Sequence, residues 1–194
     1  MERGGLNDRM DAIEAIVSRH SIAKVKPDPL PRDLIEELLY AAVQAPNHYR
    51  VRPWRFVVLT GKSRESLGEV MAQSLKKNNP DLPESAMEIE RAKPLRAPVL
   101  IAVGVDKPAD MRILEIENIC AVAAAVENLL LAAHAEGLGA MWRTGTAVRK
   151  PEVKKFLGFT ANQELLSFIY IGYEDQSVPP AERPSFEDRT TWMD

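Results

Sequence analysis

The 194-residue sequence is poor in cysteine and histidine, with one cysteine, Cys120, and three histidines. A single thiol excludes an internal disulfide and a cysteine metal cluster. The histidines do not have metal-ligand spacing, so we predict no metal site. Cys120 lies in a long apolar run, where we expect a small core side chain rather than a nucleophile.

The sequence also lacks a large excess of charge of either sign. A formal net charge of -3 gives no general electrostatic reason to bind nucleic acid or an anionic membrane. No N-terminal apolar segment resembles a signal peptide, so we expect a cytoplasmic protein. With 45% hydrophobic and 27% charged residues the composition is that of a globular protein. We predict one domain over residues 1–194, with a flexible tail at 1–9 and an extended C-terminal tail at 176–194.

Several motifs of common enzyme classes are missing. No Gly-x-Gly-x-x-Gly follows a strand, which argues against a dinucleotide-binding Rossmann unit. No serine lies in a nucleophile elbow. Gly61-Lys62-Ser63 invites a phosphate-loop interpretation, but Phe56 stands where that motif needs a glycine. We interpret Ser63 as the cap of the helix that follows.

The longest apolar stretch runs from Ile116 to Ala135 and predicts a helix that is buried on nearly every side. About 20 residues suffice to cross a membrane. However, polar residues stand at both ends and in the middle, and much of the apolar content is alanine. We therefore expect the central helix of a soluble fold, which also packs against a partner subunit. Gly137 should end this helix.

A strand at 138–142 follows, and Trp142-Arg143-Thr144-Gly145 ends it. Arg143 beside a hydroxyl and a glycine backbone is either an anion or cofactor contact, or an ordinary surface arginine. The first helix, at 11–18, leads into Arg19, Ser21 and Lys24. Two cations and a hydroxyl at a helix end suit a phosphate. They equally suit compensation of the helix dipole.

A second helix starts after Pro31 and stops at Ala45-Pro46. The loop at 47–53 carries a histidine, an aromatic ring and two arginines, and is either functional or a solvated basic loop. Residues 78–93 form a lid, a short helix or a mobile excursion. Further strands are predicted at 54–60, 97–105 and 165–173, the second of them covered on both faces.

Four separated motifs resemble one protein family. In chain order they are Arg19-His20-Ser21 with Lys24, Ala45-Pro46-Asn47-His48 continuing to Pro53-Trp54-Arg55-Phe56, Ala133 to Gly139, and Met141-Trp142-Arg143-Thr144-Gly145. Each is weak alone, but their order and spacing over residues 10–175 resemble the FMN-dependent nitroreductase family. The likeness is greatest to its small subgroup of NAD(P)H nitroreductases with a Trp-Arg-Ser-Gly segment.

The resemblance implies an α+β fold with a central, mainly antiparallel sheet flanked by helices, built as an intertwined homodimer with FMN at the subunit interface. It implies an enzyme that passes hydride from NAD(P)H through the flavin N5 to a nitroaromatic, quinone or similar acceptor, with ping-pong kinetics. The flavin performs the redox step, so no catalytic side chain is predicted.

The resemblance also implies FMN contacts from three segments. The first holds the ribityl chain and phosphate and contains Arg19, His20, Ser21 and Lys24. The second lies on the same subunit's side of the flavin, with its arginine at the phosphate, and contains Trp142, Arg143, Thr144 and Gly145. The third reaches in from the other subunit and contains Gln44 and His48. Residues 132–137 match a segment used in the subgroup for the nicotinamide nucleotide.

Three departures from the family pattern leave alternatives open. Many relatives have arginine where Lys24 stands, and lysine cannot make the same forked phosphate contact. The subgroup often has serine where Thr144 stands. A basic C-terminal phosphate clamp is not evident, and Arg183 is its nearest substitute. The alternatives are a specialised flavin enzyme of the same fold, such as a dehalogenase or desaturase, and a dimer that binds FMN, or nothing, without turnover.

Overall fold

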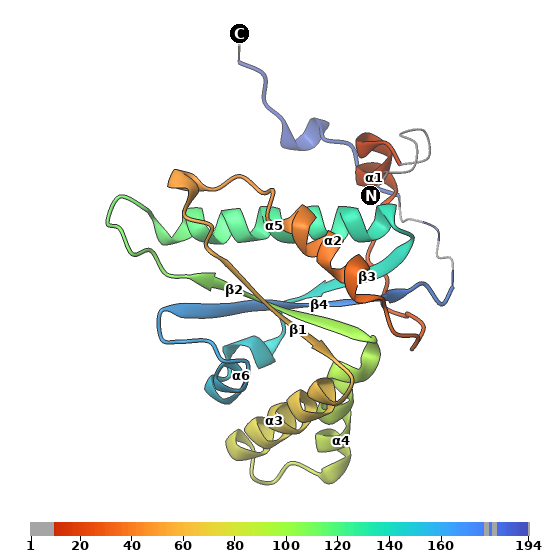
Figure 1. Cartoon of the computed structure of the whole chain (residues 1–194), viewed down its shortest axis with the longest axis vertical. Helices are drawn as coiled ribbons and strands as arrows, with labels where there is room; N and C mark the ends of the chain where they lie inside the picture. The colour runs from red at the N-terminus through yellow and green to blue at the C-terminus, as the bar shows by residue number, and fades with distance from the viewer. Residues whose placement is uncertain (1–9, 177–178, 180–181, 194) are drawn as a thin grey trace.

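The computed structural model describes residues 10–176, 179 and 182–193. Its strands form an antiparallel sheet with the spatial order β1 (Trp54–Thr60), β2 (Val99–Asp106), β4 (Gln163–Tyr173) and β3 (Leu138–Arg143). Helices cover both faces of this sheet (Figure 1). The predicted α+β fold with a central antiparallel sheet flanked by helices is confirmed.

Strand β2 shows how the sheet joins two cores. Successive side chains of a strand point to opposite faces. Val99, Ile101 and Val103 pack with α2 (Arg32–Ala42) and α5 (Glu115–Ala135). Leu100 and Ala102 pack with α3 (Lys62–Asn78) and α6 (Pro151–Phe156) on the other face. The prediction that this strand is covered on both faces is confirmed.

Helix α5 lies along one face of the sheet with α1 (Ala12–Ser18) and α2 (Figure 1). The Glu117 carboxylate accepts a hydrogen bond from the Leu114 backbone N–H at its start, and Gly137, with a φ of +71°, follows its end. By length and composition α5 could span a membrane. In the fold it is a core helix, because Ala125, Val126 and Leu129 are fully buried against the sheet.

The prediction that α5 is buried on nearly every side is wrong for this chain. Its sheet-facing side is buried, whereas Ile116 is 58% exposed and Cys120 is exposed. The predicted core position of Cys120 is therefore also wrong. The physical reason is that one sheet can cover only one side of a helix, so an all-round apolar helix keeps an open apolar side unless another element covers it.

The opposite face carries α3, α6 and α4 (Glu84–Ala92). Helix α4 resolves the three alternatives for residues 78–93 in favour of a short helix. The predicted Ser63 cap is wrong, because Gly61 occupies the N-cap position. The Ser63 hydroxyl instead donates to the Thr60 carbonyl oxygen at 2.7 Å and accepts from the Thr60 N–H at 3.1 Å. It closes the turn after β1 rather than capping the helix.

Short 3-10 turns connect these elements at η1 (His48–Arg50), η2 (Lys93–Arg96), η3 (Thr146–Arg149) and η4 (Glu187–Arg189). The predicted flexible tail at 1–9 lies outside the described residues. The described part of the predicted tail at 176–194 includes η4 and extends beyond α1 (Figure 1). That the whole chain is one domain stays a prediction.

Candidate functional site

The segment after α1 wraps around the outer edge of β3. The Ile22 N–H donates to the Ala140 carbonyl oxygen at 3.0 Å, and Val25 bridges to Glu174. A Cβ on Gly139 would lie 2.7 Å from Ile22 Cγ2, so only glycine allows this close approach. The sheet edge therefore fixes the backbone that carries Arg19, His20 and Ser21.

Arg19 is fixed on the α5 side of this segment. Its Nε donates to Glu127 Oε1 at 3.0 Å, and its side chain is 17% exposed. The Arg183 guanidinium donates to the Arg19 carbonyl oxygen at 2.6 Å. The C-terminal tail thus brings a second guanidinium to the predicted phosphate segment, at the residue that the sequence suggested as the substitute clamp.

His20 presents a buried nitrogen without a partner. Its Nδ1 lies 3.2 Å from the Ser18 carbonyl oxygen. A carbonyl oxygen only accepts, so Nδ1 carries the proton and Nε2 is the acceptor in the neutral ring. Nε2 is buried and has no hydrogen-bond partner among the described residues. A buried acceptor is costly to leave unpaired, so this position suits a ligand that donates a hydrogen bond, such as a sugar-alcohol hydroxyl.

Ser21 and Lys24 are exposed on the same segment as Arg19 and His20.

The end of β3 carries the second group of predicted FMN contacts. Arg143 lies 5.9 Å from the Tyr170 ring centroid, on the face that bears α3 and α6. Trp142 pairs with Ile169 and therefore belongs to the α5 face.

The two arginines predicted at one phosphate thus lie on opposite sides of the sheet edge. Arg19 is bound to α5, while Arg143 lies over Tyr170. Burial raises the pKa of the Tyr170 hydroxyl, and the nearby Arg96 and Arg143 guanidinium groups oppose that rise. Thr144 and Gly145 follow and are exposed. Their predicted flavin contacts stay predictions.

The third predicted group lies elsewhere. Gln44 and His48 are exposed beyond the end of α2. His48 lines an open hollow of about 450 Å³ together with residues of α5 and the preceding loop, namely Pro46, Asn47, Glu117, Cys120, Ala121 and Ala124. The His48 Nδ1 atom lies 3.8 Å from Glu117 Oε1.

The contacts that Arg19 and His48 make with helix α5 indicate how far apart these two predicted site residues lie. Arg19 contacts Glu127 and His48 contacts Glu117. Ten residues of α-helix correspond to about 15 Å. Glu117 and Glu127 are two of the polar residues that interrupt the apolar run at 116–135, but the sequence analysis missed that each contacts a predicted site residue. A charged residue inside an otherwise apolar helix was the available signal.

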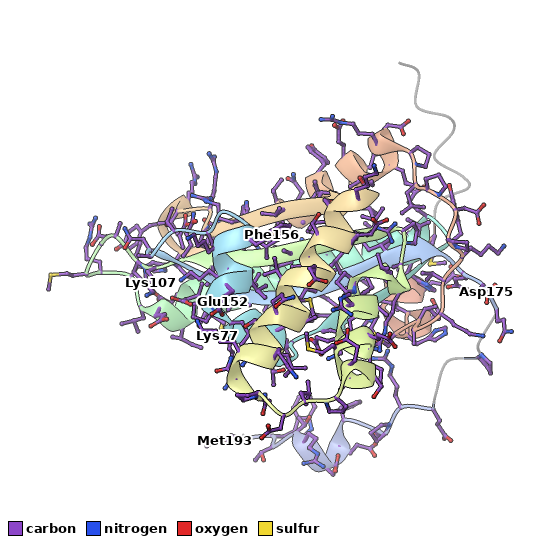
Figure 2. All side chains as sticks on the ribbon, turned by 90° about the horizontal axis from the view of Figure 1, so that it is seen from below. Lys77, Lys107, Glu152, Phe156, Asp175 and Met193 are labelled. Atoms are coloured by element: carbon purple, nitrogen blue, oxygen red, sulfur yellow. The ribbon has the colours of Figure 1, made fainter. Side chains whose placement is uncertain are left out.

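Residues 132–137 offer little open space. Ala133 is fully buried, and the Nε2 atom of His134 lies 2.8 Å from the Ser18 hydroxyl. A larger hollow, of about 640 Å³, lies between α3 and α6, where Lys77, Glu152 and Phe156 stand close together (Figure 2). It contains none of the residues that the sequence singled out.

Known proteins share this fold. The crystal structure of a nitroreductase-like family protein from Bacillus cereus superimposes with a TM-score of 0.86 at 23% identity, covering 97% of this chain and 99% of that chain. A "putative nitroreductase in complex with FMN" from Desulfovibrio desulfuricans superimposes with a TM-score of 0.68 at 25% identity, covering 89% and 91% of the two chains.

Sequence comparison leads to the same family. The Nitroreductase family model matches residues 16–173. "Putative NAD(P)H nitroreductase YfhC" of Bacillus subtilis is 29% identical over 93% of this chain and 93% of its own length. The chain belongs to the nitroreductase family, which confirms the resemblance that its sequence motifs indicated. That membership also confirms the predicted class of enzyme, an oxidoreductase.

Proposed function

We propose that the protein is an FMN-dependent NAD(P)H oxidoreductase that works as a homodimer and reduces a nitroaromatic, quinone or similar small acceptor by ping-pong kinetics. The observation that carries the proposal is the ordered Arg19–Ser21 segment, with its mostly buried guanidinium and a buried imidazole nitrogen that has no partner among the described residues. The relatives' names agree with it, since one is named for NAD(P)H and another is in complex with FMN.

The residues of the β3 edge fit the polar half of FMN. Bound FMN supplies the chemistry of accepting and donating hydride. Glu127 holds the Arg19 guanidinium in one orientation, so little side-chain freedom is lost when its remaining N–H groups bind phosphate oxygens. Ser21 provides a hydroxyl donor, and His20 Nε2 provides an acceptor for a ribityl hydroxyl.

The separation along α5 supports the proposed homodimer. Arg19 and His48 contact α5 about 15 Å apart, so within one chain they do not converge on the same part of a ligand. Two copies that pack by the open sides of α5 bring His48 and Gln44 of one subunit toward Arg19 of the other. Burial of Ile116 and its neighbours would favour this packing.

The visible absorbance spectrum tests the proposal. Purified protein should be measured as isolated and after incubation with FMN, before and after anaerobic addition of NADPH. We expect a flavin spectrum that bleaches with NADPH. A spectrum that does not bleach would favour a dimer that binds FMN without turnover, and no flavin under either condition would refute the site assignment. Turnover with nitro compounds against other acceptors separates the main proposal from a dehalogenase-like enzyme.

The Arg19→Ala substitution tests the cofactor segment. Loss of a charged hydrogen bond to phosphate should weaken FMN binding roughly tenfold or more. The matched control is Arg32→Ala, which removes an exposed arginine at the start of α2 that pairs with Glu36. Flavin content that stays unchanged in Arg19→Ala, measured by absorbance after desalting, would count against the assignment.

A further inference from the structure

The loop that follows α2 has an unusual backbone. Tyr49, Arg50 and Arg52 have φ angles of 47°, 57° and 51°. They are the non-glycine residues with positive φ in the described part of the chain. Each such residue costs about 1–3 kcal/mol and persists only where its surroundings hold it in place. This loop therefore has a defined backbone conformation, although Tyr49, Arg50 and Arg52 are exposed, and both predicted alternatives, a functional loop and a solvated basic loop, stay open.

Side chains from two loops hold this conformation. The Asn47 side-chain oxygen accepts a hydrogen bond from the Arg52 N–H at 2.9 Å. The Tyr49 ring makes an edge contact with His48, with centroids 4.3 Å apart, and Arg112 lies 5.1 Å from its centroid. Asp110 in turn holds Arg112 through hydrogen bonds of 3.0 Å. The loop is thereby fixed against the segment that precedes α5.

The arginines around this loop differ in their partners. Arg112 pairs with Asp110, and Arg55 pairs with Asp106. Arg50 and Arg52 are exposed, and neither forms an ion pair within 4.0 Å among the residues that the structure describes. The Asp106 and Asp110 carboxylates are thus already paired, whereas the Arg50 and Arg52 guanidinium groups have no ion pair among the described residues of this strained, ordered loop.

The position of these groups relates them to the proposed site. His48, the first residue of the turn, lines the hollow of about 450 Å³ beside α5. Arg50 and Arg52 follow it by two and four residues, so they flank the hollow rather than line it. In NADPH the 2′-phosphate lies at the adenosine end, opposite the nicotinamide ring. A nucleotide whose nicotinamide ring lies at His48 and whose chain runs along this loop would bring its adenosine end to Arg50 and Arg52.

We propose that Arg50 and Arg52 bind the 2′-phosphate of NADPH and make the enzyme prefer NADPH to NADH. This inference rests on the proposed function. Guanidinium groups are the usual partners of a dianionic phosphate, and an arginine commonly accommodates the 2′-phosphate of this nucleotide. The segment 132–137 is a poorer nucleotide site, because Ala133 is buried and the His134 ring is already hydrogen-bonded to the Ser18 hydroxyl.

Calorimetry on the flavin-loaded protein tests the site without turnover. Adenosine 2′,5′-bisphosphate and adenosine 5′-monophosphate differ only in the 2′-phosphate. Wild-type protein should bind the bisphosphate at least about tenfold more tightly, and the double variant Arg50→Gln/Arg52→Gln should lose that difference. The Arg32→Gln control removes an exposed arginine outside the loop and should keep it. Equal binding of the two probes by wild-type protein would overturn the inference.

Kinetics separate this inference from the proposed function. The ratio of kcat/KM for NADPH to that for NADH should exceed ten in the wild type and fall toward one in the double variant. Bleaching by both nucleotides with a ratio near one in the wild type would overturn the inference and leave the proposed function intact. A larger change for 4-nitrobenzoate than for NADPH in the double variant would also overturn it, because the arginines would then bind an acidic acceptor.

Discussion

The two helix layers of this protein differ in how much of their apolar surface is exposed to water. The layer of α3, α4 and α6 is closed by ion pairs, in which Arg91 joins Glu69 and Glu84, and Lys77 joins Glu152. The layer of α1, α2 and α5 leaves large apolar side chains in water, among them Ile13, Ile16, Val17, Tyr40 and Ile116. Exposed apolar residues also occur in the first layer, at Ile89 and Phe156, but they do not follow one helix.

The difference agrees with the proposed site. The backbone strain at Tyr49, Arg50 and Arg52 and the hollow beside Glu117 both lie with the open layer. The layer of α3, α4 and α6 is joined internally by ion pairs, although the hollow of about 640 Å³ lies within it. An open layer with strained and unpaired groups is typical of a surface that binds something else. We therefore expect substitutions in the two layers to have different consequences.

The largest effect should come from charge on the open side of α5. Cys120→Arg places a cation on an exposed position, so the single chain should still fold, but burial of that charge at a dimer interface costs several kcal/mol. We expect a monomer in sedimentation velocity and loss of bound flavin. The control is Phe156→Arg at an exposed position of the closed layer, which should leave the oligomeric state unchanged. A Cys120→Arg protein that remains dimeric would contradict the assignment of this surface.

The next effect concerns stability of the closed layer. A Cβ added to Gly68 of α3 would lie 2.2 Å from the Arg91 carbonyl oxygen of α4. Gly68→Ala should therefore push the two helices apart and lower the free energy of unfolding by about 3 kcal/mol. Urea denaturation measures this change. Gly145→Ala is the matched control, since nothing lies within 4 Å of a Cβ there, and it should change stability by less than about 1 kcal/mol.

Acid should weaken the closed layer through Glu152. Hydrogen bonds from Lys77 and Ser74 help lower the pKa of the Glu152 carboxyl from an ordinary 4.5 to about 2. The ionised form is favoured in the fold, so this stabilisation is present above pH 4.5 and is lost as pH falls toward 2. The stability difference between wild type and Glu152→Gln should shrink between pH 5 and pH 3. Glu88→Gln serves as control, and an equal shrinkage there would refute the role of Glu152.

The smallest expected effect is an increase in stability. Arg52→Gly removes the side chain from a left-handed backbone and should raise the free energy of unfolding by up to about 1 kcal/mol. The same variant should lower the preference for NADPH, so stability and specificity should change in opposite directions. Val51→Gly in the same turn, at an ordinary φ of -69°, should instead lower stability. Thermal unfolding distinguishes the two variants.

Much of the fold could be predicted because its signals are local. Apolar spacing predicted α1 and α2, and continuous or β-branched apolar runs predicted the strands. Gly137 and Gly158 end their elements with left-handed φ values, as expected of glycines after helices. The prediction failed at Ser63, because a serine near the start of a helix can bond either forward or backward along the chain, and only the turn geometry after β1 decides between them.

The residue motifs of the candidate site were also visible in the sequence, since Arg19, His48 and Arg143 each stand in a recognisable segment. Their arrangement was not. Arg143 lies on one face of the sheet because alternate residues of β3 point to opposite faces. The position of Arg19 depends on the path of the segment that runs along the edge of β3. Both depend on strand pairing between residues far apart in the chain.

The sequence by itself determined helices α1, α2 and α5, the strands and the family, because periodicity, turn residues and motif order are properties of neighbouring residues. Only the tertiary structure decided that Cys120 is exposed and that Glu117 and Glu127 contact two of the predicted site residues. It also decided that Arg50 and Arg52 have no ion pair with any residue that the structure describes. The physical reason is that burial and charge pairing arise from contacts between distant segments, which exist only when the sheet has assembled.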